Sequence, residues 1–214
     1  MGHPLKNKRI LITCGPTWVP IDAVRVVSNV SSGELGQRIA LDCARCGAKV
    51  TLLEGPVTVP LSFRSMRIVK FRFFDELQRL LRRELGKDVD AVIHAAAVAD
   101  YKLENSLRHK LSSDKKTLKL EFVPTPKLIR AIKRSAPKTF LVGFKLEPDI
   151  SRKSAHRKTS GLFQEANCDL VVANELTARG YKGFIVDKHN VVLSGATDRR
   201  QIAKALVRIL GERL

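Results

Sequence analysis

Short apolar runs alternate with longer segments of helical periodicity along this chain. Runs bounded by glycine, proline or charged residues are typical of buried strands. In the first half they predict strands at Arg9–Cys14, Lys49–Leu53, Arg67–Phe71 and Ala91–Ala97. In the second half they predict strands at Thr117–Phe122, Thr139–Phe144, Asp169–Ala173, Gly183–Asp187 and Val191–Leu193, the last two joined by a hairpin turn.

Helices are expected between these strands. Apolar residues spaced three or four positions apart predict helices at Glu34–Cys46, Phe74–Leu85, Pro126–Ser135, Ser151–Ala166 and, behind a capping residue at Asp198, up to Leu210. Gly161 is expected to interrupt the fourth helix. The alternation predicts an α/β fold, three-layer and Rossmann-like, around a mostly parallel sheet. Since such sheets bind ligands at the carboxyl ends of their strands, the loops after Cys14, Leu53 and Ala97 are candidate sites.

Composition agrees with a folded globular chain. The chain has 214 residues, of which 44% are hydrophobic and 28% charged, so it is neither disordered nor collagen-like. We expect one domain over residues 9–214, preceded by a polar segment at 1–8 in which Gly2 and His3 could derive from an expression vector. No signal peptide and no membrane-spanning run is visible, so a cytoplasmic protein without a membrane partner is expected.

The four cysteines, Cys14, Cys43, Cys46 and Cys168, do not indicate a disulfide scaffold. Cys43 and Cys46 have the C-x-x-C spacing, but they lie in a predicted helix, with no second such pair. Packed thiols are therefore favoured over a zinc or redox site.

Charge is the unusual feature of the composition. Lys plus Arg is 39 and Asp plus Glu is 21, which gives a formal net charge of +18. A solvated basic surface, a nucleic-acid partner and a polyanionic substrate such as a nucleotide all fit this charge. Only 6% of residues are aromatic and no stacking motif of the RNA-binding kind is present.

Three segments carry candidate chemistry. Small residues crowd the entry to the first helix, from Gly15 to Gly36, where exposed amides could cradle a phosphate or form a plain Ser-Gly turn. The fourth strand ends in Ala95-Ala-Ala-Val-Ala-Asp100, where Asp100 either points into the cleft or caps a turn, and His94 within the strand is more often packed than catalytic. The basic stretch Arg108–Lys116 predicts a mobile loop over a triphosphate, or a solvated loop.

Together these segments resemble the phosphopantothenoylcysteine synthetase family, also called phosphopantothenate–cysteine ligase, the ligase domain of bacterial coenzyme A biosynthesis. The matching pieces are ITCGPT at Ile12–Thr17, PIDAVR at Pro20–Arg25, SNVSSGELG at Ser28–Gly36, AAAVADY at Ala95–Tyr101, HKLSS at His109–Ser113, GFKLE at Gly143–Glu147 and DLVVANE at Asp169–Glu175. The resemblance implies that a nucleoside triphosphate activates the carboxylate of 4′-phosphopantothenate and that the acyl-nucleotide then forms an amide with L-cysteine.

The resemblance also implies the site residues. Asn29 matches the residue that holds the acyl-nucleotide, and Lys110 matches a lysine that acts on it from a mobile basic loop near residues 103–116. The substrate is expected at Arg25, Asn29, Ala95, Ala96 and Asp100. The nucleotide is expected at Gly15, Ser31, Gly33, Gly36, His94, Ala95, Ala96, Asp100, Lys110, Phe144, Lys158 and Asn174. Mg²⁺ is expected on the nucleotide phosphates, with no protein ligand assigned.

Nucleotide choice and assembly rest on the same resemblance. CTP-using bacterial members usually have GFAAET where this chain has Gly143-Phe-Lys-Leu-Glu147, a version nearer to ATP-using eukaryotic members. The other motifs look bacterial, so CTP is favoured and ATP is the alternative. Related ligases are homodimers that exchange a small β extension, for which Thr117–Phe122 is the candidate strand. A flavin-dependent phosphopantothenoylcysteine decarboxylase, fused or separate, is a further expected partner.

Two rival functions each have some support in the residues. A short-chain nicotinamide oxidoreductase would share the first β-α-β unit, and Glu54 could bind a ribose. It needs a Tyr-x-x-x-Lys pair, but Asn105 follows Tyr101 and Ile185 follows Tyr181 at that spacing. A dedicated nucleic-acid-binding module rests on net charge alone and is disfavoured.

Overall fold

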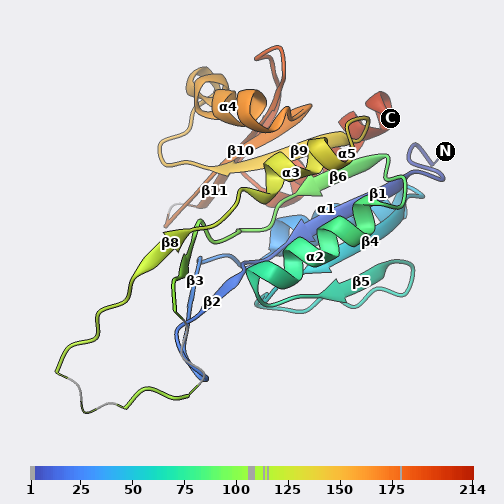
Figure 1. Ribbon diagram of the computed structural model, residues 1–214. Helices are drawn as coiled ribbons and strands as arrows, with labels where there is room; N and C mark the ends of the chain where they lie inside the picture. The colour runs from blue at the N-terminus through green and yellow to red at the C-terminus, as the bar shows by residue number, and fades with distance from the viewer. Residues whose placement is uncertain (1–2, 106–108, 113, 115, 179) are drawn as a thin grey trace.

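A large twisted sheet organises the structure, a computed structural model that describes residues 3–105, 109–112, 114, 116–178 and 180–214 (Figure 1). Among these residues the sheet has eight strands in the order β12–β11–β10–β9–β6–β1–β4–β5. Their bounds are β12 Val192–Ala196, β11 Gly180–Asp187, β10 Leu170–Thr177, β9 Phe140–Leu146, β6 Ala91–His94, β1 Arg9–Cys14, β4 Lys49–Glu54 and β5 Arg67–Lys70. Neighbours from β10 to β5 are parallel, and β11 and β12 add antiparallel pairs.

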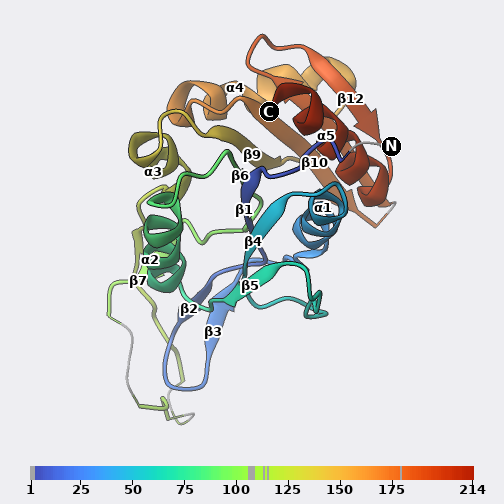
Figure 2. The same ribbon diagram turned by 90° about the vertical axis from the view of Figure 1, so that its right-hand side faces the viewer.

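Helices cover both faces of the sheet (Figure 2). They are α1 Glu34–Arg45, α2 Phe74–Leu85, α3 Leu128–Ser135, α4 Arg152–Ala166 and α5 Arg199–Arg213. Ile10 and Ile12 of β1 belong to the apolar core formed with α1 and α5, whereas Leu11 belongs to the core formed with α2 and α3. Successive side chains of a strand point to opposite faces, so one strand supplies both cores. The predicted three-layer, Rossmann-like α/β fold with a mostly parallel sheet is confirmed.

Two small two-stranded sheets project from the carboxyl edge of the main sheet (Figure 1). One pairs β2 (Trp18–Pro20) with β3 (Val26–Ser28), and the other pairs β7 (Tyr101–Leu103) with β8 (Phe122–Pro124). Val19, Ala99 and Leu103 form a separate apolar cluster between them. The sequence patterns did not predict β2, β3 or β7.

Two predicted strands extend beyond those of the structure by more than one residue. The strand expected at Thr117–Phe122 is wrong over residues 117–121, because only Phe122 belongs to a strand and the pairing with β7 begins there. Leu118 is 50% exposed. Alternation alone does not form a strand without a partner for its backbone groups. The strand expected at Ala91–Ala97 ends at His94, where the chain turns along the sheet edge.

Local packing decides two further points. Gly161 does not interrupt α4, which continues to Ala166 behind the capping residue Ser151. Leu5 is fully buried in the core beside α1, and its N–H donates to the Cys46 carbonyl oxygen at 3.1 Å. The expected boundary at residue 9 therefore leaves out a core side chain, while Met1 and Gly2 lie outside the described residues.

None of the helices in the described ranges has the length and apolar character needed to cross a bilayer.

A buried carboxylate lies toward the opposite, amino edge of the sheet. Glu84 of α2 is 3% exposed and accepts hydrogen bonds from Arg67 and Lys87 at 2.8 Å and from Arg83 at 3.1 Å. Burial alone would raise the pKa of Glu84, but these three cations hold it at about 2. The charge of Glu84 thus contributes to the packing of α2 on β5.

Candidate functional site

The loop between β1 and α1 forms a backbone cradle at the carboxyl edge of the sheet. Gly15 follows β1 with a φ of 79°, and Gly33 precedes α1 with a φ of 74°. A Cβ on Gly33 would lie 2.4 Å from Val57 Cγ1 and 3.2 Å from the Gly15 nitrogen. Only glycine fits this close, left-handed approach. Ser31 is half-buried and lies three positions before α1 in the chain. The dipole of the helix favours an anion at the first amides of α1.

Gly36 brings the start of α1 against the end of β1. A Cβ on Gly36 would lie 2.5 Å from the Cβ of Cys14. The helix therefore approaches the strand more closely than any side chain would allow. This contact fixes the position of the α1 N-terminus relative to Gly15.

The segment after β6 runs alongside the same cradle. The Ala95 N–H donates to the Thr13 carbonyl at 3.1 Å, and the Ala97 N–H donates to the Gly15 carbonyl at 2.9 Å. Asn29 Nδ2 donates to the Ala97 carbonyl oxygen at 3.2 Å. The structure thus brings together Gly15, Asn29 and Ala95–Ala97, which sequence reasoning took from three separate motifs.

His94 is packed beneath this edge. It is 7% exposed, and its Nδ1 lies 3.0 Å from Thr13 Oγ1, which also accepts from the Ala96 N–H at 3.2 Å. The Thr13 hydroxyl thus connects the His94 ring to the Ala96 amide. Burial lowers the pKa of His94 to about 4, so the ring is neutral near pH 7. This environment suits a side chain that orients Thr13 and the Ala96 amide.

Asp100 lies at the exposed end of the same segment. Its carboxylate is 61% exposed and pairs with Lys127 Nζ at 2.6 Å, just before α3. The backbone carbonyl of Asp100 accepts from the Thr125 N–H at 2.9 Å. The side chain reaches solvent next to the cradle instead of closing a turn of its own.

Arg25 and the backbone that follows Lys110 are joined by a residue that sequence reasoning missed. Asp22 accepts hydrogen bonds from Arg25 Nη1 at 2.8 Å and from the Leu111 N–H at 3.0 Å. Lys110 is exposed and directly precedes Leu111. The available signal was an aspartate three residues before an arginine in PIDAVR, which is a local turn pattern. Arg108, Ser113 and Lys115 of the predicted basic loop lie outside the described residues.

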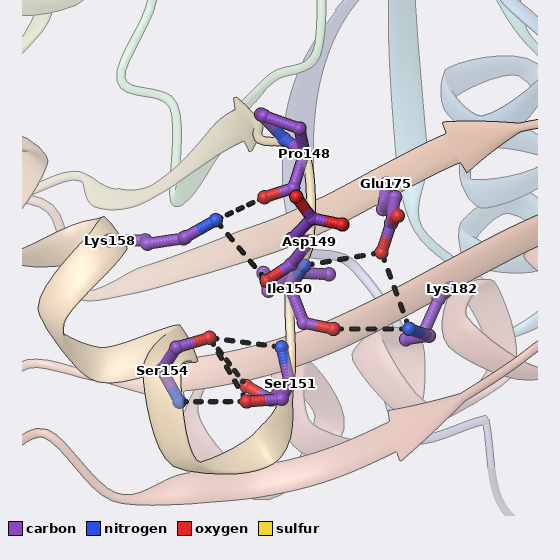
Figure 3. A network of polar contacts seen from close by, with 8 residues as sticks. All are labelled: Pro148, Asp149, Ile150, Ser151, Ser154, Lys158, Glu175 and Lys182. Atoms are coloured by element: carbon purple, nitrogen blue, oxygen red, sulfur yellow. Dashed lines mark hydrogen bonds and ion pairs between the residues drawn. The ribbon is translucent and has the colours of Figure 1, made fainter.

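The end of β9 carries the second group of predicted residues. Phe144 is half-buried against the α5-side core, and the Glu147 N–H donates to the Asn174 carbonyl at 2.9 Å. Lys158 of α4 reaches the carbonyl oxygens of Pro148 and of Asp149, the latter at 3.3 Å (Figure 3). β9 pairs with β6, so this group lies at the same sheet edge as the cradle.

A carboxylate and an ammonium group brace the loop between β9 and α4. Glu175 Oε2 accepts from the Ile150 N–H at 3.2 Å and from Lys182 Nζ at 3.3 Å (Figure 3). Lys182 also donates to the Ile150 carbonyl at 3.2 Å. Burial would raise the pKa of Glu175, but these hydrogen bonds and the ammonium group lower it. The loop thus has fixed backbone positions on both sides of Asp149.

Glu54, the ribose-binding candidate of the rival oxidoreductase, is engaged in hydrogen bonds within the protein. It is fully buried and accepts from Gln37 Nε2 at 2.7 Å, from the Leu61 N–H at 3.2 Å and from Lys70 Nζ. These hydrogen bonds engage both carboxylate oxygens and hold the loop after β4.

The cysteines have the properties of packed thiols. All four thiols are free, and burial raises the pKa of Cys14 and of Cys168 to about 12. In the described parts of the chain, no three His, Cys, Asp or Glu residues cluster as metal ligands.

Known proteins are similar to this chain in sequence and in fold. The family model of the C-terminal domain of DNA/pantothenate metabolism flavoproteins matches residues 5–209. The coenzyme A biosynthesis bifunctional protein CoaBC of Thermococcus kodakarensis is 38% identical over 215 residues, which cover 99% of this chain and 51% of that protein. The chain thus spans about half the length of this curated relative.

Solved structures agree. A crystal structure of the C-terminal domain of CoaBC has a TM-score of 0.81 and 26% identity, covering 99% of this chain and 98% of that one. A mutant of Cab2 in complex with phosphopantothenate-cysteine has a TM-score of 0.76 and 20% identity, covering 97% and 87%, and shows the fold alone. The chain therefore belongs to the family of the C-terminal domain of DNA/pantothenate metabolism flavoproteins.

Proposed function

We propose that this chain joins 4′-phosphopantothenate to L-cysteine in coenzyme A biosynthesis, through an acyl-nucleotide intermediate. The observation that carries the proposal is the convergence of Gly15, Gly33, Asn29 and Ala95–Ala97 at one edge of the sheet. Family membership supports it, as do the name of the Thermococcus kodakarensis relative and the phosphopantothenate-cysteine of the Cab2 complex.

The proposed reaction has two steps. A carboxylate oxygen of phosphopantothenate bonds to the α-phosphorus of the nucleotide, and pyrophosphate leaves. The cysteine amine then attacks the acyl carbon, loses a proton and expels the nucleoside monophosphate. The chemistry needs the triphosphate charge neutralised and the two reactants held in line. In our assignment the cradle at Gly15, Ser31, Gly33 and Gly36 binds phosphate oxygens.

Side chains around the cradle would orient the reacting groups. The Asn29 amide would hold the acyl-nucleotide, and the ammonium group of Lys110 would neutralise the charge that develops on it. Arg25 would bind the substrate phosphate. Ala95 and Ala96 would let the substrate lie flat on the strand end, beside Asp100.

The nucleotide is assigned to the β9 side of the edge. Phe144 would contact the base, with Lys158 and Asn174 bounding the same loop. We propose CTP rather than ATP, because most of the matching motifs resemble the bacterial members. Mg²⁺ would be held by the nucleotide phosphates, where it would stabilise the leaving pyrophosphate.

We further propose a homodimer formed through the two small sheets. On the first sheet Val26 is 40% exposed and Val27 is 41% exposed, and on the second Tyr101 is 58% exposed. An isolated two-stranded sheet is marginally stable in water, so covering these apolar faces would stabilise both sheets. Val27→Glu should give a monomer in light scattering, and a dimer of unchanged mass would contradict this interface.

A decarboxylase that consumes the product is the proposed partner. The curated relative is bifunctional and about twice as long as this chain. The partner would be a flavin-dependent phosphopantothenoylcysteine decarboxylase, either fused to this chain or separate from it. Flavin bound to a co-purified chain would support this assignment.

The decisive experiment measures pyrophosphate release with 4′-phosphopantothenate, L-cysteine and Mg²⁺, with CTP and ATP in separate reactions. Release that depends on phosphopantothenate supports the ligase, and the faster nucleotide identifies the physiological one. Saturable quenching of NADH fluorescence is the control for the oxidoreductase alternative. No release with either nucleotide from a folded sample would refute the proposed function.

A further inference from the structure

The carboxylate of Asp22 is the most fully engaged acidic group near the candidate site. Its side chain has no exposed surface. Oδ1 accepts from the N–H groups of Val24 at 2.9 Å and of Arg25 at 2.8 Å. Oδ2 accepts from Arg25 Nη1 at 2.8 Å and from the Leu111 N–H at 3.0 Å.

These contacts join two segments that are far apart in the chain. Asp22 and Arg25 lie in the connection between β2 and β3, which is closed by the Ile21 N–H donating to the Arg25 carbonyl at 2.9 Å. Leu111 lies 89 positions after Asp22. Arg25 Nη1 also donates to the Leu111 carbonyl at 3.4 Å, so both backbone groups of Leu111 are bound. The attachment therefore restrains the backbone immediately after Lys110.

We propose that Asp22 is a positioning residue that holds Arg25 and the Lys110 segment as one unit. The inference rests on the proposed ligase function, in which Arg25 binds substrate phosphate and Lys110 acts on the acyl-nucleotide. Asp22 itself is assigned no contact with the substrate phosphate or with the acyl-nucleotide. It fixes the direction of the guanidinium group and the path of the chain that carries the ammonium group.

The site requires a carboxylate, because every group that faces Asp22 in these contacts is a donor. An asparagine would keep one acceptor oxygen and would point an NH₂ group at a donor. Several contacts lower the pKa of Asp22 to about 2, and the hydrogen bond from the Leu111 N–H has the largest effect. Asp22 is thus ionised at any pH used for an assay, and protonation does not release the segment near neutrality.

The test uses three variants and two measurements. Asp22→Asn removes the charge and one acceptor. Asp22→Ser keeps an oxygen for the local turn but cannot reach Leu111, so it separates folding of the turn from the long-range contact. Asp42→Asn is the matched control, because Asp42 pairs with an arginine three residues on, Arg45, in α1. Amide hydrogen exchange at Leu111 and kcat/KM for 4′-phosphopantothenate are measured on each.

The expected result is that exchange at Leu111 becomes at least roughly tenfold faster in both Asp22 variants and is unchanged in Asp42→Asn. The value of kcat/KM should fall by roughly tenfold or more in both Asp22 variants. In a Lys110→Gln background, Asp22→Asn should lower kcat/KM by less than about threefold, because the effects of residues that act through one another are not additive. If Asp22 had only a structural role, the effects of the two substitutions on kcat/KM would multiply.

Three results overturn the proposal. Unchanged exchange at Leu111 in the Asp22 variants means that the contact does not hold the segment. Faster exchange with unchanged kcat/KM means that holding it has no role in the reaction. Multiplying effects with Lys110→Gln mean that Asp22 acts elsewhere. If the wild-type chain releases no pyrophosphate, the ligase function fails and the positioning role falls with it, while exchange at Leu111 still reports whether Asp22 holds the segment.

Discussion

Gly36→Ala should destabilise the protein even though alanine is the better helix former. The substitution sets two effects of opposite sign against each other. In the middle of a helix, alanine is favoured over glycine by about 1 kcal/mol. At Gly36, however, the new Cβ would lie 2.5 Å from the Cβ of Cys14, where carbon atoms prefer roughly 3.5–4.0 Å. The helix would have to move away from β1.

The magnitude follows from the rigidity of both partners. Overpacking a core contact costs about 1–3 kcal/mol, and here neither atom is the end of a flexible side chain. At a separation of 2.5 Å the cost lies in the upper part of this range, about 2–3 kcal/mol. After the gain of about 1 kcal/mol in helix propensity, the net loss is about 1–2 kcal/mol, which lowers Tm by roughly 2–8 °C for a domain of this size. Because the displaced end of α1 carries the cradle, the affinity for the nucleotide should fall as well.

Gly161→Ala is the control, since an added Cβ at this position in α4 meets no atom of the described residues within 4 Å. It should raise Tm by a few degrees, at most about 1 kcal/mol of stability. Cys14→Gly should partly rescue Gly36→Ala, whereas Cys14→Ala should not, because it keeps the clashing Cβ. Urea denaturation and nucleotide calorimetry measure both quantities. A Gly36→Ala protein as stable and as tight-binding as the wild type would refute the reasoning.

Three further outcomes are expected. Lys110→Gln should lower turnover roughly a hundredfold with little change in Tm, because the side chain is exposed; wild-type turnover would refute its role. Asn29→Asp should keep the fold but release pyrophosphate without equivalent amide product, since a carboxylate cannot donate to the Ala97 carbonyl. Tight coupling of the two products would count against this. Glu84→Gln should lower stability at pH 7. Because the folded pKa of Glu84 is about 2, the wild-type advantage should be complete above about pH 4.5 and be lost as pH falls toward 2, in urea titrations at several pH values.

The main sheet could be predicted from sequence because its strands carry their own signal. Buried on both faces, β1 and β6 read as continuous apolar runs that end in small residues or turns. The small sheets carry no such signal. β2, β3 and β7 are three residues long, and all of β3 is exposed, so their formation depends on each other and not on local burial. The same reason explains the wrong strand at Thr117–Phe122, whose alternation had no partner over most of its length.

The candidate site also has one part that could be predicted from sequence and one part that could not. Gly15, Gly33 and Gly36 could be found from sequence because only glycine fits a left-handed turn or a close helix–strand contact. The role of Asp22 in joining two segments could not be predicted, because it depends on a contact with a residue 89 positions away in the chain.

The two parts of the site differ in what fixes them. The cradle is held by the core of the main sheet, so its geometry is as rigid as the packing of α1 on β1. Arg25 and Lys110 stand on segments with little core of their own, where a single buried carboxylate replaces hydrophobic packing as the organising contact. In the proposed ligase, a nucleotide, phosphopantothenate and cysteine must all enter the site, which would combine a fixed phosphate cradle with cationic groups that lie outside the main core. Four hydrogen bonds to one buried carboxylate thus hold these charged groups where the local hydrophobic core is small.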